Sequence, residues 1–308
     1  MLETPSLSAI AALLLLMLAA PIVPGIASRT KSILTGRRGS PAWQLYADLW
    51  KLARRGIIYS TTTTWVFRLA PIVLVATALA AILLVPLDGR ASLLAFSGDV
   101  VAFAYLLALG RFTLVLAALD TGSSFEGMGA SREVTFAALV EPGIFVGLAT
   151  LGVMAHEFSL TAMLGAAQPR PGFATAGPSY VMVGLSLFAL ALAECSRVPV
   201  DDPATHLELT MVHEVMVLDH SGPDLAMILY ASALKLALFS VLIVSVFVPG
   251  ARTSAWSGLG VLLASFVLVP VAIGVVESVM ARLRLPKVPL YIAGGSALAV
   301  FGLILVLR

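Results

Sequence analysis

Eight stretches of this sequence are apolar for about 20 residues each, the length at which an α-helix crosses the hydrocarbon core of a bilayer. They lie at approximately residues 6–28, 66–86, 97–118, 132–155, 179–195, 225–248, 256–278 and 288–307. Only 12% of the 308 residues are charged, about half the share of a soluble domain. The intervals between the apolar stretches are too short for a separate soluble domain. The sequence therefore predicts an all-α, polytopic protein whose residues 1–308 form a single membrane domain.

Basic residues indicate how the predicted spans are oriented. No Lys or Arg precedes the first span, and that span is longer than the apolar core of a signal peptide, so we expect it to remain as a membrane helix. The intervals after the first and seventh spans hold most of the basic residues, which are Arg29, Lys31, Arg37, Arg38, Lys51, Arg54, Arg55, Arg282, Arg284 and Lys287. Cytoplasmic loops are enriched in such residues. We therefore expect a multi-pass protein of the inner (cytoplasmic) membrane with both termini on the outer side.

Residues 41–56, in the first long interval, have the pattern of an amphipathic helix. Leu45, Leu49 and Leu52 recur at helical spacing, and aromatic residues flank them. The charged residues, which we place on the opposite side, are Asp48, Lys51, Arg54 and Arg55. Such a helix lies at the surface of the lipid bilayer. It either completes the basic cytoplasmic loop or docks a partner subunit, in which case the contact residues are Arg37, Arg38, Asp48 and Lys51.

The next cytoplasmic interval, residues 119–133, reads LDTGSSFEGMGASRE. Its glycines and serines predict a flexible, turn-rich backbone. It lacks the lysine-containing motif of a phosphate-binding loop. We expect residues 121–131 to form a surface that contacts another subunit.

Ionisable residues crowd into residues 194–214, which begin at the end of the fifth predicted span and which we call the junction loop. They are Glu194, Arg197, Asp201, Asp202, His206, Glu208, His213 and Glu214. The histidine spacing matches no zinc motif, so we assign no metal site. Because histidine titrates near neutrality, we prefer a water-filled, proton-accessible cavity. The only cysteine is Cys195, so the chain has no CxxC pair for an iron–sulfur cluster, and we assign no catalytic residue.

A second group of ionisable residues falls within the predicted spans: Arg111, Glu133, Glu141, Glu194, Lys235 and Glu277. A charge at the bilayer centre costs about 2.5–3.5 kcal/mol on insertion scales, so these side chains should face the interior and pair or be hydrated there. One interpretation is a static ion pair, such as Glu141 with Lys235 or Arg111. The other is a path along which acids and bases exchange protons through water. Arg111 and Glu277 lie close enough to a span end for their side chains to reach the interface.

Two motifs resemble those of a known family. The first basic interval has GRRG at 36–39 and then Gln44, Asp48, Lys51 and Leu52, similar to Q-P-x-x-D-x-x-K-L with Leu45 in place of the proline. The junction loop has Glu194, Arg197, Pro199, Asp201 and Pro203, similar to E-x-x-R-x-P-x-D-x-P. The chain thus resembles the large membrane-arm subunit of group 4 energy-converting [NiFe] hydrogenases of the formate hydrogenlyase type. That family is homologous to the quinone-chamber subunit of respiratory complex I.

Departures from the motifs favour the hydrogenase branch. Ala204 and His206 stand where complex I subunits usually have glutamates, and the G-x-N-R-V-G-P stretch after the basic pair is missing. For this reason we assign no quinone ligand. Two other functions stay open: a quinone-binding subunit, which would need a lipophilic chamber near Arg197, and a stand-alone secondary transporter.

The resemblance implies a coupling and anchoring subunit that links cytoplasmic redox chemistry to proton or sodium movement. The implied partners are [NiFe] hydrogenase large and small subunits, an iron–sulfur protein and an antiporter-like membrane subunit, with no nucleic acid. A NiFe centre and iron–sulfur clusters are expected in those partners and no cofactor in this chain. The proton path or coupling residues would be Glu133, Glu141, Glu194, Lys235 and Arg111. Arg197, Asp201, Asp202, His206, Glu208, His213 and Glu214 would form the cytoplasmic junction.

Overall fold

The computed structural model describes residues 7–88, 91–164, 173–202, 211–248 and 255–308. Every regular element in these ranges is a helix. The helices are α1 (Leu7–Ala19), α2 (Ile22–Leu34), α3 (Gln44–Ala53), α4 (Trp65–Leu83), α5 (Asp99–Asp120), α6 (Ser124–Ala155), α7 (Leu160–Leu164), α8 (Phe173–Glu194), η1 (Glu214–Val217), α9 (Gly222–Phe247), α10 (Ala255–Val279), η2 (Leu285–Lys287) and α11 (Val288–Leu307).

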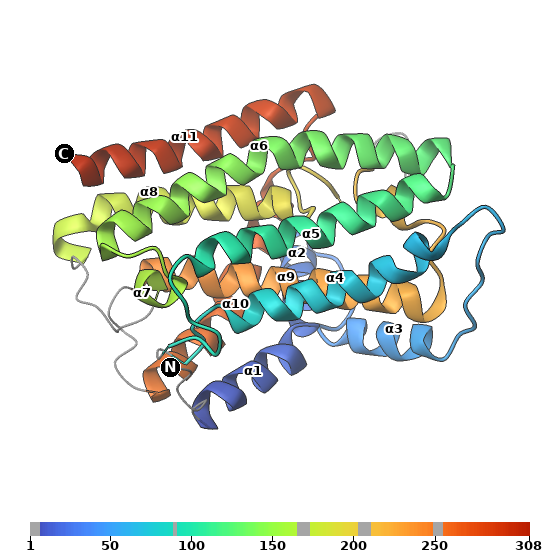
Figure 1. Cartoon of the computed structure of the whole chain (residues 1–308), viewed down its shortest axis with the longest axis horizontal. Helices are drawn as coiled ribbons and strands as arrows, with labels where there is room; N and C mark the ends of the chain where they lie inside the picture. Colours follow the sequence, from blue (N-terminus) through green and yellow to red (C-terminus); the bar gives the residue numbers. More distant parts are fainter. Residues whose placement is uncertain (1–6, 89–90, 165–172, 203–210, 249–254) are drawn as a thin grey trace.

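The long helices form a bundle whose members run roughly along one direction (Figure 1). In the described part of the chain, seven helices are long and apolar enough to cross a membrane, and the bent pair α1–α2 is an eighth candidate. The prediction of an all-α polytopic protein with about eight spans is thereby confirmed.

Helix α9 lies at the centre of the bundle. It packs against α3, α4, α8 and α10. Buried residues make up 72% of its most apolar stretch but only 22% of that of α11. A helix that is apolar on all sides is stable when other helices surround it. The polar side chains that α9 carries therefore face other protein groups, whereas α11 presents most of its surface outward.

The first predicted span is broken. Helices α1 and α2 meet at Ala20 and Pro21 and are bent by 48°. Pro21 has no N–H to donate to the carbonyl of Met17, so the helix loses that hydrogen bond. The Tyr230 hydroxyl of α9 donates to the Met17 carbonyl instead (3.0 Å), and the Tyr46 hydroxyl of α3 donates to the carbonyl of Leu18. Two tyrosines from other helices thus satisfy the carbonyls that the break leaves free.

Helix α3 packs against α2 and α9, as expected for an amphipathic helix. Leu45, Leu49 and Leu52 are half-buried, whereas Lys51 and the two arginines that follow the helix are exposed. Asp48 is an exception to the predicted pattern, because it is half-buried on the same side as the leucines. Its carboxylate accepts a hydrogen bond from the Gln44 side chain at 3.0 Å.

The prediction of a turn-rich backbone at residues 119–133 is wrong, because α6 begins at Ser124 and continues through the glycines. Tertiary contacts override the low helix propensity of these glycines. Gly129 lies so close to η1 that a Cβ there would be 2.2 Å from a methyl carbon of Val215. Glu126 is fully buried, and its carboxylate accepts a hydrogen bond from the Asp219 amide at 3.1 Å. Much of this stretch therefore packs inside the chain itself.

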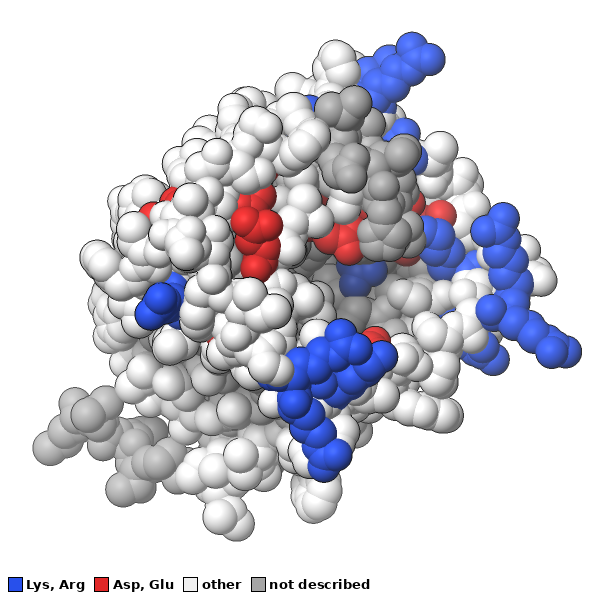
Figure 2. Space-filling model, turned by 90° about the vertical axis from the view of Figure 1, so that its right-hand side faces the viewer, with Lys and Arg blue, Asp and Glu red and all other residues white. Residues whose placement is uncertain are grey.

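The two ends of the bundle differ. The described chain begins and ends at one end, while α3, the start of α4 and the junction loop lie at the other (Figure 1). Figure 2 looks onto that second end and shows Lys and Arg side chains projecting from it, with patches of acidic side chains between them. This is the end that the positive-inside rule assigns to the cytoplasm.

Candidate functional site

A buried guanidinium joins three helices of the bundle. Arg111 of α5 contacts the carboxylates of Glu141 on α6 and Glu194 at the end of α8. Its Nε lies 3.6 Å from the carboxylate of Glu133, two turns before Glu141 on α6. Only 9% of the Arg111 side chain is exposed. The fixed fork of an arginine suits it to several carboxylates at once.

Lys235 adds a fourth helix to this group. It lies in the middle of α9, and its Nζ is 2.7 Å from the same oxygen of Glu194 that Arg111 contacts. Glu194, with a side chain only 3% exposed, is therefore shared by two cations. Burying an unpaired charge is very unfavourable, so these groups stabilise one another in place. We call Arg111, Glu133, Glu141, Glu194 and Lys235 the buried network.

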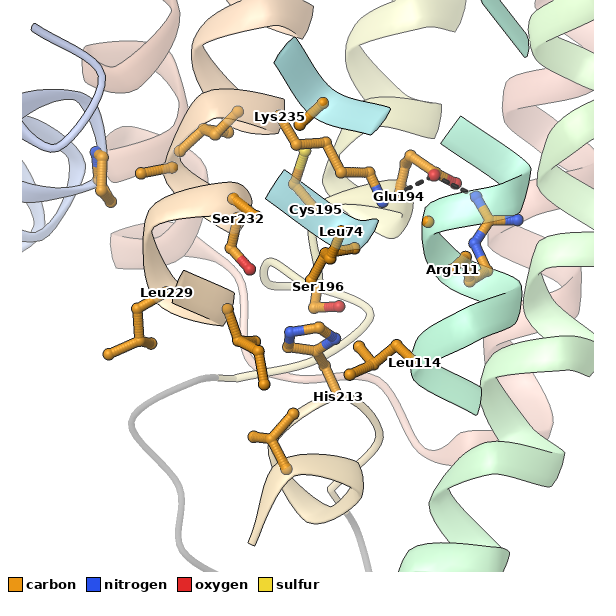
Figure 3. A pocket seen from close by; sticks show the side chains of 18 of the residues that line it. Leu74, Arg111, Leu114, Glu194, Cys195, Ser196, His213, Leu229, Ser232 and Lys235 are labelled. Atoms are coloured by element: carbon orange, nitrogen blue, oxygen red, sulfur yellow. Dashed lines mark hydrogen bonds and ion pairs between the residues drawn. The ribbon is translucent and has the colours of Figure 1, made fainter. Parts of the chain in front are cut away.

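The buried network borders a cavity of about 230 Å³ between α5, α8 and α9. In Figure 3, Lys235 and Arg111 approach Glu194 from opposite sides, and His213 points toward Ser196 from below. Four members of the network line the cavity: Arg111, Glu133, Glu194 and Lys235. The rest of its wall is largely apolar and includes Leu74, Leu114 and Leu229. The volume is sufficient for several water molecules, each of which occupies about 30 Å³ in the liquid.

Junction-loop residues line the same cavity from the proposed cytoplasmic side. They are Arg197, Asp201, His213 and Glu214. Burial lowers the pKa of His213 below its ordinary value, which favours the neutral ring at neutral pH. His206 and Glu208, which we also predicted for this group, lie outside the described residues.

Asp201 organises the junction loop. Its carboxylate accepts hydrogen bonds from the amides of Asp202, Val212 and His213 at 3.0–3.2 Å. The guanidinium of Arg282, after α10, lies 3.0 Å from it. These contacts hold both ends of the loop against the base of α10. Asp201 is 3% exposed, and its contacts fix this part of the cavity wall in place.

Two residues that sequence reasoning gave little weight complete a second set of ion pairs. Glu277 of α10 lies 3.5 Å from the Arg197 guanidinium and 3.7 Å from the ammonium of Lys31. Lys31, at the end of α2, also lies 3.8 Å from Asp202. In the sequence, Lys31 stands out only as one of the basic residues that follow the first span. The signal for Glu277 was present in the sequence, since it is an acid inside an apolar stretch.

Arg111 and Glu277 lie close enough to span ends to reach the interface, but their side chains do not do so. Both side chains turn inward and are less than 10% exposed. Each meets oppositely charged groups on neighbouring helices, which offsets the cost of leaving water. The ion pair between Arg111 and Glu141, named above as the static alternative, is present, and it stands beside a cavity. The other pair named above, Glu141 with Lys235, is not formed, because Glu141 contacts Arg111 and Lys235 contacts Glu194.

The predicted docking residues lie at the basic end of the bundle. Arg37, Arg38 and Lys51 are exposed there, as a partner contact would require. Asp48 is partly occupied by its hydrogen bond to Gln44. In the ranges that the structure describes, no group of three or more His, Cys, Asp or Glu side chains is placed to hold a metal ion.

Comparison with known proteins shows the family to which this chain belongs. The NADH dehydrogenase family profile matches residues 7–307. The chain belongs to the NADH dehydrogenase family. Hydrogenase-4 component C of Escherichia coli (strain K12) is 32% identical over 285 residues, covering 90% of this chain and 88% of that protein. Formate hydrogenlyase subunit 4 of the same organism is 32% identical over 285 residues, covering 90% of each.

A solved structure shares the fold. It is that of the membrane-bound sulfane sulfur reductase, an archaeal respiratory membrane complex. The TM-score is 0.83 over 97% of this chain and 98% of that chain, at 19% identity. The match shows that the fold is shared, while the family profile and the two relatives confirm the resemblance drawn from the motifs in the first basic interval and the junction loop.

Proposed function

We propose that this chain is the membrane-anchoring and coupling subunit of a multi-subunit, hydrogenase-like complex. The two relatives, a hydrogenase-4 component and a formate hydrogenlyase subunit, support this assignment. A NiFe centre and iron–sulfur clusters would be held by partner subunits on the basic end of the bundle. This chain would hold that assembly on the membrane and convert its charge changes into movement of protons or sodium ions.

The observation that carries the proposal is the continuity of the buried network with the cavity. Junction-loop groups line the proposed cytoplasmic side of the cavity, and Glu194 and Lys235 line it deeper in the bundle. Ion pairs then lead from Glu194 through Arg111 to Glu141. A change of charge at the junction would alter the electrostatic balance of every pair along this line.

The network reaches the outside of the bundle at Glu141. This carboxylate lies near the middle of the 32-residue α6, and its side chain is 40% exposed. Exposure of an acid to acyl chains is unfavourable. A second membrane subunit that covers the α5–α6 face would remove this cost. The antiporter-like partner expected above fits that place, and it would receive the ion from Glu141.

The test is purification of the chain with its partners from native membranes in a mild detergent. We expect nickel, iron–sulfur proteins and one large additional membrane subunit to accompany it. Recovery of a homogeneous lone chain that transports a solute in vesicles would refute the proposal and support a secondary transporter.

One observation favours quinone binding as a second candidate function. The cavity has a mostly apolar wall and includes Arg197, as a quinone chamber would require. Its volume of about 230 Å³ is below the range of about 300–1,000 Å³ that is typical of sites for small molecules. A photoreactive quinone analogue that labels Cys195, in the cavity wall, would support this candidate. Absence of labelling at saturating analogue would oppose it.

A further inference from the structure

Close packing between α2 and α10 sets the position of Glu277. A Cβ added to Gly274, one turn before Glu277, would lie 2.6 Å from both the Ala27 carbonyl oxygen and the Cβ of Thr30. Such an approach is possible because glycine has no side chain. It brings Lys31, which follows Thr30, within 3.7 Å of the Glu277 carboxylate. The pair is therefore placed by the backbones of two helices.

The other oxygen of Glu277 faces the wall of the cavity. It lies 3.5 Å from the guanidinium of Arg197, which lines the cavity three residues after Glu194. Glu277 itself lies behind Arg197, outside the cavity lining. It can therefore act on the cavity through the guanidinium.

Glu277 differs from Glu194 and Asp201 in how it is held. Glu194 is hydrogen-bonded to Arg111, and Asp201 accepts hydrogen bonds from three amides. The Glu277 oxygen that faces Arg197 is buried and accepts no hydrogen bond from any described residue. A buried oxygen that accepts no hydrogen bond is energetically unfavourable, so the presence of this carboxylate calls for an explanation. Packing alone would be served equally well by glutamine.

We propose that Glu277 is a positioning residue of the coupling site: its charge holds the Arg197 guanidinium in the cavity wall. Lys31 extends this arrangement to the junction loop, because its ammonium lies at nearly equal distances from Glu277 and Asp202, 3.7 and 3.8 Å. A change of charge near Asp202 would draw Lys31 toward or away from Glu277, and the hold on Arg197 would change with it. This inference rests on the proposed coupling function and names how that site is regulated.

The test uses the full complex in membrane vesicles with a potential-sensitive dye, which reports charge movement by protons or sodium alike. Glu277→Gln should leave assembly and hydrogen turnover unchanged and lower the charge moved per turnover by about fivefold or more. Glu277→Asp should recover most of the loss, because it restores the charge. Ser278→Ala, next to Glu277 on α10, is the control for disturbance of the helix and should have no effect.

A double-variant comparison tests whether Glu277 acts through Arg197. In an Arg197→Gln background, Glu277→Gln should cause no further loss. Independent, additive losses would overturn the proposal, as would equal losses in Glu277→Asp and Glu277→Gln or unchanged coupling in Glu277→Gln. If the unsubstituted complex moves no charge during turnover, the proposed function fails and this inference fails with it.

Discussion

Arg111 and Glu194 form a buried ion pair that joins α5 to α8 across 83 positions of the sequence. The same carboxylate oxygen meets Lys235 from α9, so two cations share one acid. With Glu133 and Glu141 the group contains three acids and two bases. A fully ionised network would thus carry a net charge of one negative, which a proton or a bound cation would neutralise.

Replacing Arg111 with Met should destabilise the chain strongly. Three acids would then face a single cation, and breaking a buried pair typically costs about 3–5 kcal/mol. We expect a clearly lower midpoint of thermal unfolding in detergent, followed by intrinsic fluorescence. Arg68→Met is the matched control, because that exposed guanidinium lies over the Tyr59 ring outside the network. Equal midpoints for both variants would contradict the account of the network.

The hydroxyl of Tyr230 should stabilise the break between α1 and α2. Tyr230→Phe removes the donor to the Met17 carbonyl and should cost about 0.5–1.5 kcal/mol locally. Hydrogen exchange measured by mass spectrometry should then be faster at residues 18–26 than in the unsubstituted chain. Tyr105→Phe, which alters a tyrosine that is 69% exposed on α5, should leave exchange there unchanged. An identical effect of both changes would show that the hydroxyl does not hold the break.

Two glycines of α6 should respond oppositely to alanine. Gly129→Ala places a methyl group 2.2 Å from Val215 and 3.0 Å from the carbonyl of Val212, so it should destabilise the chain by about 1–3 kcal/mol. Gly127→Ala meets only a Leu119 methyl at 4.0 Å and should be neutral or stabilising, because alanine favours the helix. Thermal unfolding of the two variants in the same detergent decides this. A stable Gly129→Ala protein would mean that η1 does not press on α6.

His220 should make the stability depend on pH. Its ring stacks on Phe67 at 3.9 Å between ring centres, and burial lowers its pKa from 6.5 to about 4. The folded chain thus keeps a neutral ring while the unfolded chain takes up a proton below pH 6.5. The contribution of the neutral His220 ring to the free energy of unfolding is fully present above pH 6.5. It is lost as the pH falls toward 4, and the loss amounts to up to about 3 kcal/mol.

The measurement is the unfolding midpoint of the solubilised chain at pH 7.5 and pH 5. His220→Phe should reduce the difference between the two values. His156→Gln is the control, because it changes an exposed histidine that directly follows the last residue of α6, Ala155. An unchanged difference in His220→Phe would assign the acid sensitivity to other groups.

The spans could be predicted from the sequence because apolar length is a local property. The break in the first span also had a local signal, since Pro21 and Pro24 cannot donate in a helix. The start of α6 was missed although Ser123 and Glu126 have the spacing of a capping box. In the structure the Glu126 carboxylate bonds to Asp219 instead, which no local pattern predicts.

The membership of the buried network was predictable, but its pairing was not. Ionisable residues inside apolar stretches, such as Glu141 and Lys235, can be recognised directly in the sequence. Which cation meets which acid depends on how each helix is rotated and how closely it packs. The pair of Lys31 with Glu277 depends on the approach of α2 to Gly274. Lys31 lies just after the first apolar segment, whereas Glu277 lies in the seventh. Sequence reasoning could not establish that contact.

The most direct test of the central claim is the charge moved per hydrogen turned over in vesicles that carry the assembled complex. Glu194→Gln and Glu141→Gln should each reduce this ratio by at least about tenfold while the redox activity persists, because the proposed path would lose a group that can take up and release a proton. Glu157→Gln, an exposed acid beyond the far end of α6, should leave the ratio unchanged. Assembled Glu194→Gln and Glu141→Gln complexes with the full ratio would contradict the account.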